Sequence, residues 1–79
     1  MTMAKHVRKS KLQIEEEIRR QAQGAARANG EAVTIALPTI AVTTEPTRSG
    51  SHWILAETGQ LGRAHVETAA VRIARLWDV

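Results

Sequence analysis

Residues 10–29 carry apolar side chains at the spacing of one face of an α-helix. With each residue turning by about 100°, the predicted buried stripe consists of Ile14, Ile18, Ala22 and Ala25. Ser10 stands three residues before Gln13, which is the spacing of a capping box. Asn29 and Gly30 supply a typical left-handed helix stop. The pattern therefore predicts a helix that begins after Ser10 and ends at about Asn29.

The charges on this helix are arranged to support it. Glu15 and Arg19, and likewise Glu16 and Arg20, stand four residues apart in the favourable order. Such pairs stabilise a helix by about 0.2–0.5 kcal/mol each. The apolar stripe changes from Ile to Ala along the helix, so we expect the closest packing near its C-terminal half.

Residues 32–45 are rich in β-branched side chains and alternate as a strand does. The apolar positions are 33, 35 and 37 before Pro38, and 40 and 42 after it. A shift of one residue exchanges the two faces of a strand, and proline cannot donate to a central ladder. Pro38 therefore marks a bulge or a tight turn, and the segment is either one long bent strand or two short ones.

Turn residues separate this segment from a further strand. Residues 45–51 read Glu-Pro-Thr-Arg-Ser-Gly-Ser, which predicts a hairpin loop. Residues 52–57 contain Trp53, Ile54 and Leu55 and predict the next strand, which ends at Thr58 and Gly59.

Residues 61–77 predict a second helix. Its expected buried stripe consists of Val66, Ala69, Ala70, Ile73 and Trp77, flanked by Ala74 and Leu76. Thr68, Arg72 and Arg75 are expected to point outward, and Val71 beside them hints at a partner surface. The chain therefore predicts an α+β fold in which two helices pack on one face of a small antiparallel sheet, in the order α-β-β(-β)-α. Residues 10–79 form this single domain, and residues 1–9 form a flexible basic arm.

The composition leaves little material for a core. Among the 79 residues there is no Phe and no Tyr, Ile, Leu and Val number 17, and Ala numbers 13. Small domains usually compensate with disulfides, metal or oligomerisation. Without Cys there is no disulfide and no cysteine zinc ligand, so we expect a homodimer. No apolar run is long enough for a membrane span, the basic start lacks a secretory hydrophobic stretch, and we expect a cytoplasmic protein.

The positive charge of the chain is concentrated at its start. The net charge is +3, of which residues 1–11 carry +4 and residues 12–79 carry −1. A basic arm of this kind binds phosphate by counterion release, or is a solvated, disordered terminus. The candidate contacts to a partner or to nucleic acid are the cationic side chains Lys5, Arg8, Lys9, Lys11, Arg19, Arg20, Arg27, Arg48, Arg63, Arg72 and Arg75.

Candidate catalytic residues are few. His52 follows Ser49 and Ser51, but all three lie in or beside one loop, whereas a triad draws its members from separate elements. The three consecutive glutamates at 15–17 point in three directions on a helix and cannot act as a carboxylate pair. We therefore predict no catalytic residue and no enzymatic activity.

Candidate residues for a metal, cofactor or anion site are equally few. His6, His52 and His65 have neither HExxH spacing nor a histidine partner four residues away, so no metal site and no cofactor is expected. Residues 59–63 precede a helix whose backbone amides can hold an anion, but a flexible strand-to-helix turn explains the same glycines. Trp53 and Trp77 are expected as core anchors rather than as a base-stacking platform.

The predicted order of elements resembles that of the double-stranded-RNA-binding domain. The resemblance rests on Thr58 and Gly59, which lead into a helix that carries Ala69, Ala70 and Ala74. That family places paired lysines at the start of its last helix, where residues 60–63 read Gln-Leu-Gly-Arg in this chain. The aromatic strand positions of the family are also missing. The resemblance therefore implies an order of elements and not RNA binding.

The general build also resembles that of small phage-encoded anti-CRISPR proteins, which are compact α/β domains without a catalytic set. The resemblance implies inhibition of a CRISPR effector complex by direct binding, through a block of DNA recognition or of nuclease recruitment. Many such inhibitors are acidic DNA mimics, whereas this chain is basic. Contact through its arginines and sheet surface, or with an acidic protein patch, is therefore expected.

Two hypotheses follow. In the first, the chain is a small non-enzymatic protein-binding inhibitor of phage or mobile-element type that acts in the host cytoplasm. In the second, it is a small nucleic-acid-binding or regulatory protein that uses the basic arm and surface arginines.

Overall fold

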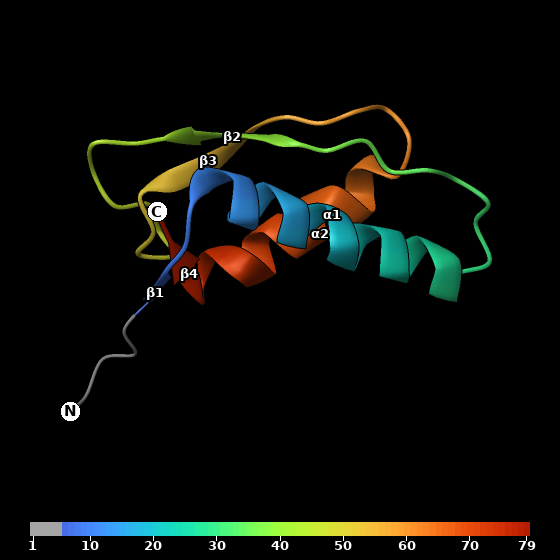
Figure 1. The fold of residues 1–79 in the computed structure, drawn as a ribbon, viewed down its shortest axis with the longest axis horizontal. Coiled ribbons are helices and arrows are strands. Elements are labelled where there is room, and N and C mark those ends of the chain that lie inside the picture. Colours follow the sequence, from blue (N-terminus) through green and yellow to red (C-terminus); the bar gives the residue numbers. More distant parts are fainter. Residues whose placement is uncertain (1–5) are drawn as a thin grey trace.

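The computed structural model describes residues 6–79, and its fold has two layers. The elements follow in the order β1 (Val7–Arg8), α1 (Lys11–Ala28), β2 (Thr39–Val42), β3 (Trp53–Glu57), α2 (Arg63–Ala74) and β4 (Trp77–Asp78). The hairpin of β2 and β3 lies over α1 and α2, which pack side by side (Figure 1). This arrangement is the predicted α+β fold, with both helices on one face of a small antiparallel sheet.

α1 begins at the predicted capping box. The Ser10 hydroxyl accepts a hydrogen bond from the Gln13 N–H at 3.1 Å, and the Gln13 side chain accepts one from the Ser10 N–H at 2.9 Å. The buried residues of this helix are Ile14, Glu15, Ile18, Ala22 and Ala26. The prediction of Ala25 was wrong, because the buried face follows the i,i+4 row and that row reaches Ala26.

The ion pairs on α1 also differ from the prediction. Glu15 pairs with Lys11 at 2.9 Å, and Glu17 pairs with Arg20, in place of the predicted partners. Glu15 lies on the buried side of the helix, whereas Arg19 is exposed.

Pro38 marks the boundary between an unpaired extended segment and a short strand. Residues 32–38 form no ladder, and β2 covers only Thr39–Val42. In the sheet Ile40 lies opposite Leu55 and Val42 opposite Trp53, with an irregularity between Thr39 and Ile40. The long strand is therefore absent. The irregularity directly after the proline produces the expected change of face.

The core lies between the sheet and the helices. It consists of the side chains Ile14, Ile18, Ala22, Ile35, Ile40, Trp53, Val66, Ala69, Ala70, Ile73 and Ala74. Trp53 is its largest member, as predicted, and it is 2% exposed. Ala22 of α1 and Ala69, Ala70 and Ala74 of α2 belong to this core, and the two helices pack against each other.

α2 is shorter than the predicted helix. It ends at Ala74, and Trp77 belongs to β4, where its side chain is only half-buried. Leu76, which was expected beside the buried stripe, is exposed. The helix begins after Gly62, whose φ of +68° turns the chain tightly against Ile35.

The two ends of the described chain meet. β1 pairs in parallel with β4, so that Val7 lies opposite Trp77 and Arg8 opposite Asp78. Lys9 places its ammonium group 4.9 Å from the centre of the Trp77 ring. The prediction of a free arm over residues 1–9 is therefore wrong for residues 6–9, which belong to the folded body. Lys5 and the rest of that arm lie outside the described residues. Within residues 6–79, no helix combines the length and the apolar character that crossing a membrane requires.

Candidate functional site

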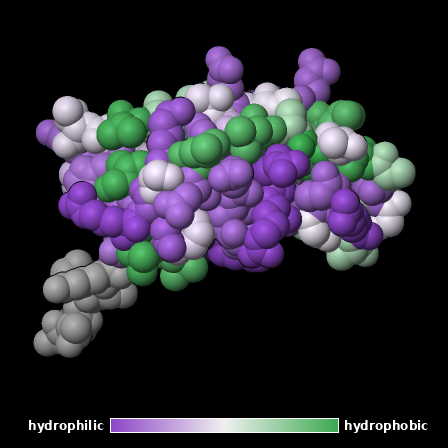
Figure 2. Space-filling view, viewed as in Figure 1, coloured by the Kyte–Doolittle hydropathy of each residue, from purple (hydrophilic) through white to green (hydrophobic). Residues whose placement is uncertain are grey.

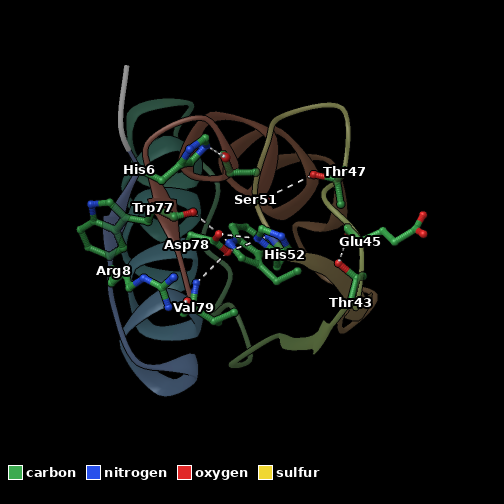
Figure 3. Close-up of polar contacts among 12 residues, drawn as sticks. His6, Arg8, Thr43, Glu45, Thr47, Ser51, His52, Trp77, Asp78 and Val79 are labelled. Carbon is green, nitrogen blue, oxygen red and sulfur yellow. Dashed lines mark hydrogen bonds and ion pairs between the residues drawn. The ribbon is translucent and has the colours of Figure 1, made fainter. Parts of the chain in front are cut away.

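The first candidate is a histidine–carboxylate pair that the sequence did not predict. The His52 Nδ1 atom lies 2.7 Å from the Asp78 Oδ2 atom, and the His52 N–H donates to Asp78 Oδ1 at 2.7 Å (Figure 3). The Val79 N–H also donates to Oδ1, at 2.8 Å. Only the fold brings these residues together, because 26 positions separate them in the sequence.

The environment of Asp78 holds its carboxyl group in the charged form. Burial raises the pKa of Asp78, but the hydrogen bonds from the His52 ring and from the backbone N–H groups of His52 and Val79 outweigh it. The net effect places the pKa of Asp78 below its ordinary value. A carboxylate on Nδ1 is the arrangement that makes the other ring nitrogen a base in hydrolases.

A hydrolase site of this kind also needs a nucleophilic hydroxyl, and among residues 6–79 none faces His52. Ser51, the neighbouring hydroxyl, is fully buried and shares a hydrogen bond of 3.2 Å with Thr47 (Figure 3). Among residues 6–79 no hydroxyl hydrogen-bonds to the His52 ring. The pair instead anchors β4, and the Trp53 indole N–H supports the same strand by donating to the Trp77 carbonyl at 3.0 Å. The contacts of the His52–Asp78 pair are therefore structural.

A second histidine–carboxylate pair links α2 to the segment that follows α1. The His65 Nε2 atom lies 2.6 Å from the Glu31 Oε2 atom, and Asn29 donates to the same oxygen at 3.3 Å. The hydrogen bond from His65, followed by that from Asn29, lowers the pKa of Glu31 below its ordinary value. Glu67, which stood near His65 in the sequence, instead pairs with Arg63. In the described part of the chain, no three His, Asp or Glu side chains gather into a possible metal site.

The candidate cationic residues are distributed over every layer of the fold. Three of them pair with acids: Lys11 with Glu15, Arg20 with Glu17 and Arg63 with Glu67. Two are engaged at the chain ends, where Lys9 lies over Trp77 and Arg8 donates to the Val79 carbonyl at 3.3 Å. The others are exposed, namely Arg19 and Arg27 on α1, Arg48 in the β2–β3 loop, and Arg72 and Arg75 on α2.

Among residues 6–79, the exposed arginines lie on different faces of the fold. Arg19 and Arg27 lie on α1, away from the side that faces α2, whereas Arg72 borders the seam between the helices. Arg48 lies beside the sheet. The structure therefore separates the residues that the sequence grouped by charge.

A hollow lies between β3 and α2, and we call it the β3–α2 groove. Its volume is about 490 Å³, within the range of about 300–1,000 Å³ of ligand-binding pockets. Residues 53–55 form its wall, residues 47–49 form one end, and Glu67, Ala70, Val71 and Ala74 form its floor. Ile54 is 49% exposed and Val71 is 53% exposed, so the groove presents apolar side chains to solvent.

The groove continues into a second hollow beyond Leu55. The lining there is Leu55, Ala56, Glu57, Thr58, Arg63 and Glu67. The trough as a whole therefore has Arg48 at one end and two glutamates with one arginine at the other. Its two ends carry opposite net charge.

The backbone along the groove belongs to an edge of the sheet with which no further strand of the described chain pairs. Thr43 N–H donates to the His52 carbonyl at 2.8 Å, and Val42 lies opposite Trp53. Because hydrogen-bonded and non-hydrogen-bonded positions alternate in an antiparallel pair, Trp53 and Leu55 direct their N–H and C=O groups away from β2. No other described residue hydrogen-bonds to these groups.

Exposed apolar side chains lie on both layers of the fold. On the face shown in Figure 2, hydrophobic surface lies mainly along the sheet and the segment that leads into it, with a further patch beside the chain ends, while much of the helix surface is hydrophilic. The exposed large apolar residues are Val7, Leu12, Leu37, Val42, Ile54, Leu61, Val71 and Leu76. Two of these, Ile54 and Val71, line the β3–α2 groove.

No family model, no curated protein and no solved structure matches this chain. The site is therefore assigned from its own geometry. The sequence did signal one part of it, because Val71 was an apolar residue on a polar helix face. The groove itself depends on the position of α2 against β3, which a linear pattern does not specify.

Proposed function

We propose that this protein is a non-enzymatic protein-binding module, and that its contact surface is the β3–α2 groove. The observation that carries the proposal is the open edge of β3, which borders exposed apolar side chains of β3 and α2. Exposed apolar residues beside unpaired backbone groups are a surface that a protein segment covers well. The charged ends of the trough give such a contact an orientation.

Within this proposal the protein is an inhibitor that occupies a surface of its target. The general build suggests a CRISPR effector complex as that target. The groove supplies the contact, and no catalytic residue is assigned, because the His52–Asp78 pair is engaged in holding β4.

The experiment compares the wild-type protein with Val71→Glu, which places a charge in the groove floor. Val42→Glu is the matched control, because Val42 is a similarly exposed valine outside the groove lining. Proteins captured from host lysate by the wild type and by Val42→Glu, but not by Val71→Glu, are purified and their affinity is measured by calorimetry. Purified CRISPR effectors are tested in the same way with a DNA-cleavage readout.

A purified partner that loses affinity only with Val71→Glu supports the proposal. Equal affinity of both variants for every purified partner contradicts it. Nucleic acid is the other class, and a gel-shift series in salt detects it, because phosphate contacts give an affinity that falls steeply as salt rises. Salt-sensitive binding to nucleic acid, without a groove-dependent protein partner, would favour that hypothesis instead.

A further inference from the structure

We infer that the occupant of the β3–α2 groove is a single extended segment of a partner protein, which adds to the sheet as a third strand beside β3. This inference rests on the proposed function and specifies the form of the partner. It follows from three features of the described residues: the contrast between the two sheet edges, the width of the two layers, and the charges of the trough.

The two edges of the hairpin differ in their hydrogen bonds. On the β2 side, the outward N–H of Ile40 donates to the Glu15 carboxylate at 2.9 Å. In the preceding segment, the Gln23 side chain donates to the Val33 carbonyl at 2.8 Å and accepts from the Ile35 N–H at 2.9 Å. Helix α1 thus engages the Ile40 N–H and the segment before β2 with side chains. Among residues 6–79, no side chain of α2 hydrogen-bonds to the backbone of Trp53 or Leu55, which favours the β3 edge as the one that accepts another strand.

The layers also differ in width. Neighbouring strands lie about 4.8 Å apart, whereas packed helices lie about 8–10 Å apart. Two strands over two helices therefore leave part of one helix uncovered. The uncovered part is the flank of α2 that carries the exposed Val71, beside the buried Ala70 and Ala74 of the groove floor. A single added strand would cover it.

A second copy of this chain fits the edge poorly. Pairing β3 with β3 of another copy around a two-fold axis puts both helix layers on the same side of the joined sheet. The two α2 helices would then meet beneath the joined strands, closer than the distance at which helices pack. The groove therefore suits an isolated strand that carries no helix beneath it.

The charges define the sequence of the partner segment. An antiparallel strand, the more stable orientation, would start near Glu57 and end near Arg48. A basic residue near its start and an acidic residue near its end complement the two ends of the trough. Between them, side chains at alternate positions face Ala70 and Ala74, so these should be apolar and of moderate size.

Random nine-residue peptides displayed on yeast provide the probe, and they are sorted for binding to the full-length protein. Binders that also bind Val71→Glu are removed, and Val42→Glu is the matched control. We expect the remaining peptides to share alternating apolar residues with a basic residue before them and an acidic residue after them. Sorting against Arg48→Glu should change the acidic preference to a basic one.

The best peptide is then synthesised and studied by NMR with the wild-type protein. At saturation the amide exchange of Trp53 and Leu55 should slow by about tenfold or more, because these N–H groups gain a partner. Methylation of the peptide amide opposite Leu55 should reduce affinity about tenfold, and methylation of the next amide, which points away, should not. The reversed sequence should bind weakly.

Each other result overturns the inference in a distinct way. Peptides that need Val71 but do not slow the amide exchange of Leu55 would support the proposed function and contradict the added strand. A dimer mass in light scattering that Val71→Glu abolishes would make a second copy the occupant. The absence of any groove-dependent peptide or protein would remove both the inference and the proposed function.

Discussion

The Glu15 carboxylate on α1 accepts a hydrogen bond of 2.9 Å from the backbone N–H of Ile40 on β2. Glu15 is buried, and the Lys11 ammonium group bonds to the same oxygen at 2.9 Å. Burial raises the pKa of Glu15, but the Ile40 N–H and Lys11 outweigh it, so the pKa lies below the ordinary value. A helix side chain therefore replaces the missing neighbour of a sheet edge.

Replacement of Glu15 tests this relationship. Glu15→Ala leaves the Ile40 N–H without its partner, and we expect the free energy of unfolding to fall by about 1–3 kcal/mol. Glu15→Gln keeps an acceptor of the same shape and should cost less than Glu15→Ala. Urea unfolding followed by tryptophan fluorescence measures both, with the exposed neighbour Glu16→Ala as the control. Equal stability of the Glu15→Ala and Glu16→Ala variants would mean that water replaces the carboxylate without cost.

The sequence predicted those parts of the fold that depend on local patterns. The capping box at Ser10, the hairpin loop and the buried stripe around Val66 and Ile73 were confirmed. Each arises from contacts within one element or between neighbours in the chain. The prediction of where α2 ends was wrong, because Trp77 pairs with Val7, a partner 70 positions away.

Apart from the outward Val71, the candidate site was not predictable from sequence patterns. The sequence predicted Glu15 as the partner of Arg19 in a helix ion pair, and only the position of β2 reveals it as an acceptor for Ile40. Likewise, nothing in the sequence pairs His52 with Asp78. The cationic side chains were grouped by charge alone, and charge content carries no information on which face each side chain occupies.

Replacement by alanine should have opposite effects on stability at two of the glycines. Gly24 lies within α1 with no atom near the position of an added Cβ, so Gly24→Ala should stabilise the protein by about 0.5–1 kcal/mol. Gly62 has a φ of +68°, and an added Cβ would lie 2.0 Å from Ile35 Cδ1. Gly62→Ala should therefore destabilise by about 1–3 kcal/mol. Thermal and urea unfolding of the two variants check the signs, and stabilisation by both substitutions would contradict the packing of Ile35 against this turn.

The His52–Asp78 pair predicts a dependence of stability on pH. The pKa of Asp78 is lower in the folded protein than the value of about 3.9 in an unfolded chain. The charged form thus favours folding, so its contribution is present above pH ~3.9 and is lost as the pH falls through the folded pKa. At pH 7 Asp78→Asn should lower the free energy of unfolding by about 1–3 kcal/mol.

Urea unfolding of the wild type and of Asp78→Asn, repeated from pH 7 downward, separates this effect from those of other acids. We expect the difference between the two proteins to shrink as the pH falls below ~3.9, because the wild-type carboxyl group becomes neutral too. Glu45→Gln, an exposed acid with no ion pair in the described chain, is the control. A difference that stays constant across this range would assign the effect to packing and not to charge.

The pairing of β1 with β4 makes the start of the chain part of the folded body. The Val7 N–H donates to the Leu76 carbonyl at 2.9 Å, and the Lys9 N–H donates to the Asp78 carbonyl at 2.8 Å. Val7→Pro removes the first donor and should lower the free energy of unfolding by about 1–3 kcal/mol. Val7→Ala keeps the donor and trims a side chain that is already exposed, so its effect should be smaller. If the proline variant were as stable as the alanine variant, residues 6–9 would behave as the free basic arm that charge alone suggests.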